Sequence, residues 1–170
     1  TGTIKLGIKT STDDSFGEII REQKIPNLTK ITIERFLNNF RGEIDQIPPK
    51  VSSIHIKGER AYKRFQKGES FTIPSRRVKI NQLNLIEWKR DLGEIKIEVH
   101  CSSGTYIRSL ARDIGTQIGC GGHLKELRRI EALGFTSAQS IQLPNKNQDS
   151  KIILGKILDP IKGLNHMPSL

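Results

Sequence analysis

The chain has 170 residues, a formal net charge of +10 and a pI near 9.8. A chain of this length is expected to form one domain, in which roughly 70% of the surface exposed on unfolding is buried. No apolar run approaches the roughly 18 residues of a membrane helix, so no membrane span is expected. The charge favours a polyanionic partner, with nucleic acid first and an anionic membrane second, although a well-solvated lysine surface gives the same composition.

The first residues, TGTIKLGIKT, have neither the apolar core nor the cleavage site of a signal peptide. They lack a Met and open within a strand pattern, so we expect the chain to begin partway into a longer protein. Cys101 and Cys120 are too few for a disulfide framework. Since no export signal is present, the expected compartment is the reducing cytoplasm.

Strand and helix patterns are mixed along the chain. Alternation of apolar and polar residues predicts strands over residues 3–9, 78–88 and 94–101, and a short strand around Phe135. Helical spacing predicts helices over residues 29–40, 57–68, 106–118, 124–130 and 152–158. This order lacks strict β-α-β alternation. It therefore predicts an α+β fold with a mixed, mainly antiparallel sheet flanked by helices.

Four side chains have the chemistry of zinc ligands, namely His100, Cys101, His123 and Cys120. His100 and Cys101 are consecutive in a predicted strand, so their side chains point to opposite faces of the sheet. The sequence also has no C-x-x-C pair. These observations argue against a metal centre.

A helix-turn-helix DNA-binding protein is one alternative. The helix predicted over residues 106–118, the turn GCGG and the basic helix predicted over residues 124–130 have that outline. However, a strand directly precedes the first helix, and the apolar residues of the second would need most of its surface for the core.

The stretch CSSGTYIRSLARDIG, residues 101–115, indicates a strand end, a tight turn and the start of a helix. Side chains at such a joint can project into a cleft at the sheet edge. Tyr106 could stack on a nucleobase, and Arg108 could form a bidentate pair with a carboxylate or phosphate. The alternative is that Tyr106 belongs to the core and Arg108 to the helix surface. The hydroxyl groups of Ser102 and Ser103 are expected to cap the helix.

Three separated segments resemble the TruB type of tRNA pseudouridine synthase: QIPPKVSSIHIKGERAYKRFQKGE, RRVKI and VHCSSGTYIRSLARDIGTQIGCGGHLKELRR. Members of this family carry a Q-x-P-P-x-x-S-A segment, a G-x-x-x-Y helix, and C-S-x-G-T-Y-I-R-x-L followed by D-x-G and a glycine-rich turn into L-R-R. The opening, IKLGIKTSTDDSFGEI, resembles the family's strand and its T-x-T-x-D turn. The resemblance covers most of residues 1–141.

The resemblance implies an enzyme that isomerises a T-loop uridine of tRNA to pseudouridine without cofactor or metal. It implies that Tyr106 and Arg108 are active-site residues, that Arg108 pairs with the catalytic Asp, and that Leu127 is an apolar wall of the uridine pocket. Further contacts with the substrate RNA are expected from Tyr62, Lys57, Arg60, Lys63 and Arg64. For the four basic residues the alternative is a solvated helix face.

The chain departs from the family at the catalytic segment. The family's Asp lies in a G-x-L-D-P-x-A-T-G segment, which is missing here, and the stacking Tyr that precedes the position of Thr1 is missing too. Asp159 shares only L-D-P with that segment and lies at the wrong end of the chain. We therefore expect residues 1–143 to be the C-terminal part of a catalytic domain, inactive alone, with residues 144–170 as a tail.

Two expectations follow from this departure. The strands over residues 3–9 and 94–101 should have uncovered apolar faces, and hence self-associate, unless an N-terminal segment or a partner chain completes the sheet. The functional alternative is a non-catalytic RNA-binding module or one half of a split enzyme.

Overall fold

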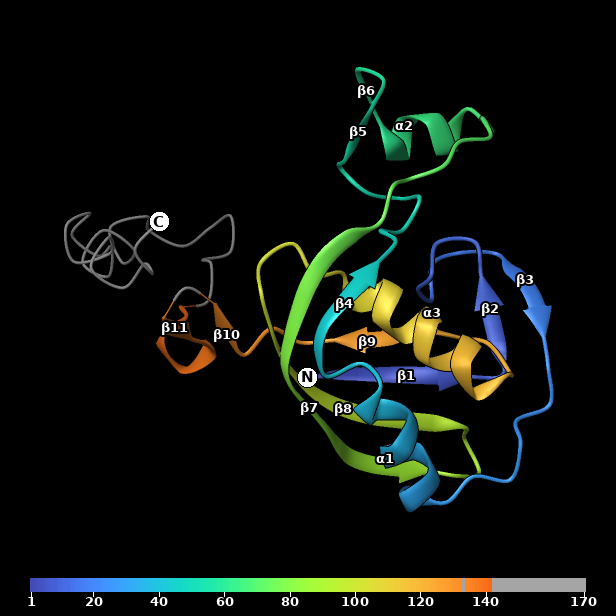
Figure 1. Ribbon diagram of the computed structural model, residues 1–170, viewed down its shortest axis with the longest axis vertical. Helices are drawn as coiled ribbons and strands as arrows, with labels where there is room; N and C mark the ends of the chain where they lie inside the picture. The colour runs from blue at the N-terminus through green and yellow to red at the C-terminus, as the bar shows by residue number, and fades with distance from the viewer. Residues whose placement is uncertain (133, 142–170) are drawn as a thin grey trace, which may run out of the picture. The chain divides into compact units, whose positions relative to one another are not determined.

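The computed structural model describes residues 1–132 and 134–141. The chain divides into two compact units, Thr1–Leu127 and Arg128–Leu170. The first unit contains β1 (Gly2–Leu6), β2 (Ile8–Thr10), β3 (Ile19–Glu22), α1 (Lys30–Asn38), β4 (Gly42–Gln46), β5 (His55–Ile56), β6 (Glu59–Arg60), α2 (Ala61–Gln66), β7 (Arg76–Lys89), β8 (Glu94–Cys101), α3 (Ile107–Ile118) and β9 (Gly122–Leu127) (Figure 1).

The described part of the second unit contains β10 (Glu131–Ala132), β11 (Phe135–Thr136) and a short 3-10 helix, Ser137–Gln139. β10 and β11 pair antiparallel, which confirms the strand expected around Phe135. The helix expected over residues 152–158, the boundary expected at residue 143 and Asp159 all lie outside the described residues.

The first unit is built on a five-stranded sheet of order β4-β7-β8-β1-β9 (Figure 1). Each neighbouring pair of strands is antiparallel. In β1, Ile4 lies opposite Ile95 of β8 on one side and Leu124 of β9 on the other. The predicted α+β fold with a mainly antiparallel sheet is confirmed.

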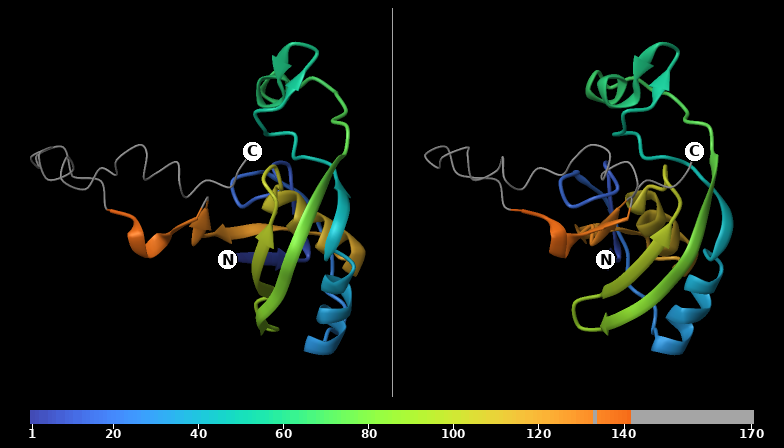
Figure 2. Two further views of the ribbon diagram at one scale, coloured as in Figure 1. Left: turned by 60° about the vertical axis from the view of Figure 1, so that its left-hand side comes forward. Right: turned by 90° about the vertical axis from the view of Figure 1, so that its left-hand side faces the viewer.

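Both longer helices cover one face of this sheet (Figure 2). Alternate strand residues point into the layer between sheet and helices, so the side chains of Ile4, Leu6, Ile95 and Ile97 are at most 1% exposed. Their cluster includes Leu110 of α3. The expectation that the strands over residues 3–9 and 94–101 have uncovered apolar faces is therefore wrong, because α1 and α3 cover them.

Residues 124–130 do not form the expected helix. Residues up to Leu127 belong to β9, which pairs with β1 along the edge of the sheet. The spacing of Leu124, Leu127 and Ile130 fits a helix, but a helix of seven residues gains few hydrogen bonds, whereas the sheet edge satisfies the backbone. The helix-turn-helix alternative thereby loses its second helix.

The expected helix over residues 57–68 is shorter than predicted. Lys57 and Gly58 have φ values of 49° and 83° and form the two-residue turn between β5 and β6. Positive φ at both positions is typical of the hairpin turns that match strand twist. Within this range only the residues from Ala61 to Gln66 are helical, as α2.

α3 has the predicted extent and ends in a tight reversal into β9. Gly119 adopts the left-handed conformation at its C-cap, with φ 91°. A Cβ on Gly115 would overlap the backbone of Gly121 and Gly122, and would lie 2.6 Å from the Gly121 carbonyl oxygen. Glycine at 115 therefore permits the close packing of α3 on the chain that enters β9.

The opposite face of the sheet carries polar residues, among them the nearly buried Glu94, which is paired with two partly exposed lysines. Glu94 Oε1 accepts a hydrogen bond of 2.8 Å from Lys125 Nζ and lies 4.0 Å from Lys5 Nζ. The bond from Lys125 lowers the pKa of the Glu94 carboxyl, against the opposing effect of burial.

We predict that Glu94→Gln lowers the melting temperature at pH 7 but not near pH 3. A carboxyl with a lowered pKa in the folded state contributes stability above its ordinary pKa of 4.5, and loses it as pH falls through the lowered value. Thermal unfolding monitored by circular dichroism across this pH range measures the difference. Lys125→Gln should reproduce the loss, and a difference that persists at pH 3 would contradict the assignment.

Candidate active site

Arg108 lies in the first turn of α3 and joins three segments of the chain. Its Nη1 atom donates to Asp14 Oδ2 at 3.1 Å and to the Thr12 carbonyl oxygen at 3.3 Å. Its Nη2 atom donates to the Val51 carbonyl oxygen at 2.8 Å. The side chains of Arg108 and Asp14 are 25% and 19% exposed, so the pair lies at the surface of the fold but is largely removed from water.

Asp14 is held from its other side by the turn between β2 and β3. Its Oδ1 atom accepts a 2.6 Å bond from the Thr12 hydroxyl and a 3.1 Å bond from the backbone N–H of Phe16. The Thr10 hydroxyl donates to the Asp14 carbonyl oxygen at 2.7 Å. Short polar side chains that bond to their own turn fix its conformation. One carboxylate oxygen thus belongs to the turn, and the other is directed to Arg108.

The sequence predicts an Asp outside this chain as the partner of Arg108, and Asp14 was missed. The signal was present, since Thr10, Thr12 and Asp14 are the T-x-T-x-D turn of the family resemblance. What the pattern alone does not reveal is that this turn lies against α3, nearly a hundred positions later in the chain. Pairing of Arg108 with a second Asp stays a prediction.

Tyr106 is the N-cap residue of α3, and Gln46 fixes its backbone. The Tyr106 N–H donates to Gln46 Oε1 at 2.8 Å, and the Gln46 side chain is fully buried. The Arg76 guanidinium carbon lies 5.8 Å from the centroid of the Tyr106 ring, within the range of a cation–π contact. The expected capping by Ser102 and Ser103 is wrong, because no side chain of the described residues caps α3; the Ser102 hydroxyl accepts instead from the Lys79 N–H.

Leu127, the last residue of β9, is 57% exposed. It lies opposite Gly2 of β1, and its Cδ1 atom is 3.7 Å from the position that a Cβ on Gly2 would occupy. The side chains of Leu124 and Leu127 therefore pack closely over Gly2. An exposed leucine on this edge is compatible with the predicted role as an apolar wall, which stays a prediction.

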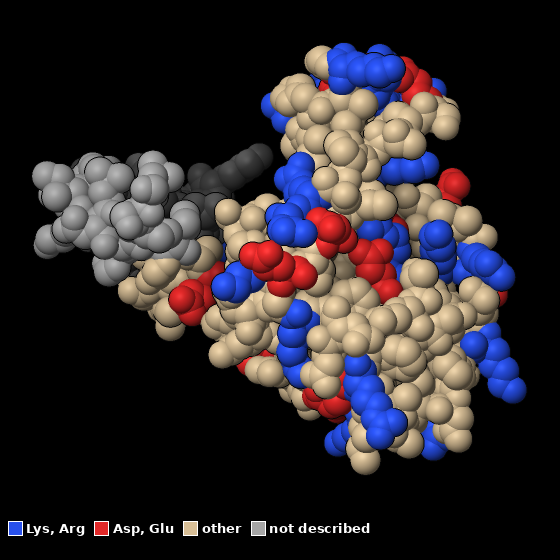
Figure 3. All heavy atoms as spheres, in the orientation of Figure 1, with Lys and Arg blue, Asp and Glu red and all other residues tan. Residues whose placement is uncertain are grey.

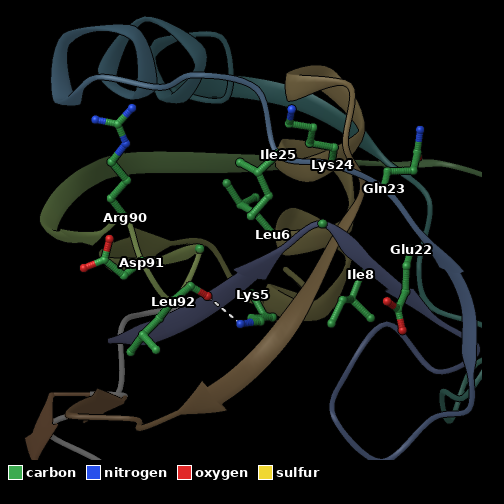
Figure 4. A pocket seen from close by; sticks show the side chains of 12 residues that line it. Lys5, Leu6, Ile8, Glu22, Gln23, Lys24, Ile25, Arg90, Asp91 and Leu92 are labelled. Carbon is green, nitrogen blue, oxygen red and sulfur yellow. Dashed lines mark hydrogen bonds between the residues drawn. The ribbon is translucent and has the colours of Figure 1, made fainter.

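Two hollows on the described surface are lined by residues other than the predicted site residues. One, of about 520 Å³, lies between the end of β1, residues 22–25 and the turn at residues 90–93 (Figure 4). Leu6 and Ile25 line it, and Lys5 Nζ donates to the Leu92 carbonyl oxygen at its rim. The other, of about 320 Å³, is lined in part by His123 and Glu94. None of the predicted site residues lines either hollow.

The predicted RNA-contacting residues lie on a projection formed by residues 51–68, which extends from the sheet between β4 and β7 (Figures 1 and 2). Basic side chains gather on it beside a few acidic ones (Figure 3). Arg64 is paired with Glu69 at 2.8 Å, and Lys67 with Glu59 at 2.7 Å. The Lys67 bond lowers the pKa of Glu59.

The other four residues predicted to contact RNA differ in their solvent exposure and in their bonds within the chain. Lys57 and Lys63 are exposed and form no ion pair within the described residues. Arg60 is exposed, and its Nη1 atom donates to the Ser53 carbonyl oxygen at 3.2 Å. Tyr62 is half-buried, with its backbone N–H bonded to the Ser52 carbonyl oxygen. Lys57 and Lys63 are therefore the cations best placed to meet an external anion.

The side chains considered as zinc ligands are not grouped around a common point. Nδ1 of His123 lies 3.0 Å from the Ile8 carbonyl oxygen. Burial raises the pKa of the Cys120 thiol. Over residues 1–132 and 134–141, no group of three or more His, Cys, Asp or Glu side chains is arranged to hold a metal ion. In the same ranges, no helix combines the length and apolar character needed to cross a membrane.

Comparison with known proteins gives consistent matches over nearly the whole chain. The family model for the N-terminal domain of TruB family pseudouridylate synthases matches residues 1–107, and that for the tRNA pseudouridylate synthase B C-terminal domain matches residues 108–161. A tRNA pseudouridine synthase B from Prochlorococcus marinus is 51% identical over 169 residues, which is 99% of this chain and 54% of the relative. The enzyme of the same name from Synechococcus sp. (strain WH7803) is 46% identical over 171 residues, 98% of this chain and 57% of the relative.

Solved structures share the fold at lower identity. A Cbf5–Nop10–Gar1 complex superposes with a TM-score of 0.55 at 23% identity, covering 80% of this chain and 30% of the other. An H/ACA RNP bound to a substrate RNA containing 2'-deoxyuridine gives a TM-score of 0.52 at 20% identity, with coverages of 82% and 30%. The chain spans about half the length of the curated relatives it matches. From its family matches and its identity to these relatives, the chain belongs to the TruB family of pseudouridylate synthases.

Proposed function

We propose that the protein carrying this chain is a cytoplasmic RNA-modifying isomerase that converts a T-loop uridine of tRNA to pseudouridine. The observation that carries the proposal is the 51% identity to a tRNA pseudouridine synthase B over 99% of the chain. In this proposal residues 1–143 are the C-terminal part of the catalytic domain. The basic composition of the chain supports an RNA partner.

The reaction breaks the bond between N1 of uracil and C1′ of ribose, turns the base and joins C5 to C1′. The hydrogen on C5 is released to solvent as N1 becomes protonated, so atoms balance without a cofactor. The base must first leave its stack, at a cost of a few kcal/mol. We assign the ring of Tyr106 and the side chain of Leu127 to the walls beside the everted base.

We assign Arg108 the role of orienting carboxylates beside that base. Its guanidinium already binds the Asp14 carboxylate at 3.1 Å. We propose that the catalytic Asp itself comes from an L-D-P-x-A-T-G segment outside these 170 residues. It would approach Arg108 at the surface that the side chain still exposes.

A tritium-release assay on a T-arm stem-loop labelled at C5 of uridine tests the proposal. The full-length gene product is expected to release tritium, and the 170-residue chain alone is expected to release none. Release by the chain alone would contradict the external origin of the catalytic Asp. Tight RNA binding without release by the full-length protein would instead favour a non-catalytic RNA-binding module.

We predict that the double substitution Lys57→Gln/Lys63→Gln weakens RNA binding and lowers its salt dependence. Each lysine that meets a phosphate contributes roughly one unit to the slope of log K against log salt, so the slope should fall by about two. Filter binding of a T-arm RNA at several salt concentrations measures it. Lys67→Gln, on the same projection but already paired with Glu59, is the control and should change the slope less. Equal slopes for the double variant and wild type would contradict phosphate contacts here.

A further inference from the structure

A second arginine–aspartate pair lies one helical turn from the first. Arg112 follows Arg108 by four residues on α3, so both side chains lie on one face of the helix. Arg112 Nη1 binds Asp13 Oδ2 at 2.9 Å, as Arg108 Nη1 binds Asp14 Oδ2 at 3.1 Å. Two consecutive acidic residues of the turn are therefore clamped by two arginines of the helix.

Each arginine also binds residues 47–51, the segment that leads from β4 into the first residue of the projection. Arg112 Nη2 donates to the Ile47 carbonyl oxygen at 2.8 Å, and Arg108 Nη2 donates to the Val51 carbonyl oxygen at 2.8 Å. The two side chains thus repeat one arrangement, in which a terminal nitrogen holds the turn and another holds the segment at residues 47–51. Arg112 is therefore bonded from α3 to both segments.

Asp13 adopts a backbone conformation that few residues other than glycine adopt. Its φ is +62°, and the residue is only 8% exposed. Its carbonyl oxygen accepts the N–H of Leu124, which ties the turn to β9 as well. Such strained conformations persist where the surroundings determine them, and they cluster at functional sites. Asp13 directly precedes Asp14, whose carboxylate binds Arg108 at 3.1 Å.

Arg112 is poorly suited to bind a phosphate. All three of its nitrogens are bonded within the described residues, because Nε and Nη2 also bind the two carboxylate oxygens of Asp113 at 2.8 and 3.2 Å. Two carboxylates therefore surround one guanidinium. Its side chain is 16% exposed, less than that of Arg108. A phosphate group of RNA would have to displace these carboxylates to bind Arg112.

The burial of the Asp13 carboxylate has an energetic cost. Burial raises the pKa of the Asp13 carboxyl against the opposing effect of Arg112, so the charged form is costly in this position. Buried ion pairs are often no more stable than apolar replacements, and their better-attested use is to fix one arrangement. We therefore look for the role of the Asp13–Arg112 pair in the position that it gives to the neighbouring Asp14.

We propose that Asp13 and Arg112 are positioning residues that set the geometry of the Asp14–Arg108 pair. The proposal rests on the function proposed above for Arg108. Neither residue touches the reacting atoms in this scheme. Their effect is on the placement of Asp14, and small displacements of a site by distant groups can lower rates by about 100-fold.

Single-turnover tritium release by full-length protein tests this. Asp13→Asn keeps the side-chain shape and tolerates positive φ, so it removes charge with little change of backbone. Asp13→Asn and Arg112→Gln should each lower the rate about 10- to 100-fold, while the RNA dissociation constant changes less than about threefold. The double variant should be no slower than the worse single variant, and Arg112→Lys should recover part of the rate. Gln117→Ala, at an exposed position of the same helix, is the control and should change the rate less than about threefold.

A second measurement does not depend on activity. The coupling between Arg108 and Asp14, obtained from a double-mutant cycle of urea unfolding, should fall by about half or more in the Asp13→Asn background. Unchanged rates and unchanged coupling would overturn the positioning role. Reduced RNA affinity at an unchanged rate would identify Arg112 as an RNA contact and also overturn it. A lower coupling in a protein that releases no tritium would refute the proposed function while leaving the positioning geometry intact.

Discussion

Arg108→Gln is expected to lower the single-turnover rate of the full-length protein by at least about 100-fold, which corresponds to about 2.7 kcal/mol of transition-state stabilisation. Arg108 binds Asp14, Thr12 and Val51 through two nitrogens, so its loss releases the turn and the segment at residue 51 together. Glutamine can replace one of these bonds but carries no charge. Quenched-flow or manual single-turnover tritium release at saturating enzyme measures the effect.

Removal of Arg108 should also destabilise the fold by about 1–3 kcal/mol, because the partly buried Asp14 loses a charged partner. Arg77→Gln is the matched control, since Arg77 is also paired with carboxylates but is 71% exposed. It should change stability by less than about 0.5 kcal/mol and leave the rate unchanged. Full activity of Arg108→Lys, which keeps the charge but loses the fork of donors, would contradict the assigned role.

Gly115→Ala is expected to cost about 3 kcal/mol or more of folding free energy, because overpacking of a tight core usually costs about 1–3 kcal/mol and here the clash is with main chain. An added Cβ would overlap the backbone of Gly121 and Gly122, and backbone cannot rotate away as a side chain can. Relief requires α3 and β9 to separate, which breaks the bond from the Gly121 N–H to the Gly115 carbonyl oxygen, 2.9 Å long.

Urea unfolding of Gly115→Ala beside Gln117→Ala measures this cost. Gln117 is exposed on the same helix, so alanine there should change stability by less than about 0.5 kcal/mol. Since β9 carries Leu127 and is bonded to the turn at Asp13, a displaced β9 should also slow tritium release. A stability of Gly115→Ala equal to that of Gln117→Ala would show that the reversal is looser than the structure indicates.

The elements that could be predicted from the sequence are those with a strong local pattern. The alternation in β1, β7 and β8 and the apolar face of α3 identify these elements, because each buries one face against the core. For β9 the sequence instead predicts a helix, because three apolar residues at intervals of three fit a helical face. Its pairing with β1, more than a hundred positions away, decides its structure.

The candidate site shows the same limit. Tyr106 and Arg108 stand out in the sequence because an aromatic residue and an arginine flank the start of a helix. Their partners Gln46 and Asp14 lie in the Q-x-P-P and T-x-T-x-D segments of the family resemblance, but the sequence does not show which groups they contact. Tertiary structure gives these residues their roles by bringing Gln46 to the N–H of Tyr106 and Asp14 to the guanidinium of Arg108.

The bond from Arg108 to the Val51 carbonyl oxygen has a thermodynamic consequence. Val51 is the first residue of the projection. This bond therefore connects the proposed RNA-binding projection to Arg108, the residue proposed to orient the catalytic carboxylate. A movement of the projection that displaces Val51 would change the length of that bond. Thermodynamic linkage is reciprocal. If RNA binding stabilises or destabilises the Arg108–Val51 bond, formation of that bond changes the free energy of RNA binding by the same amount. RNA affinity and the orientation of Arg108 are therefore expected to change together.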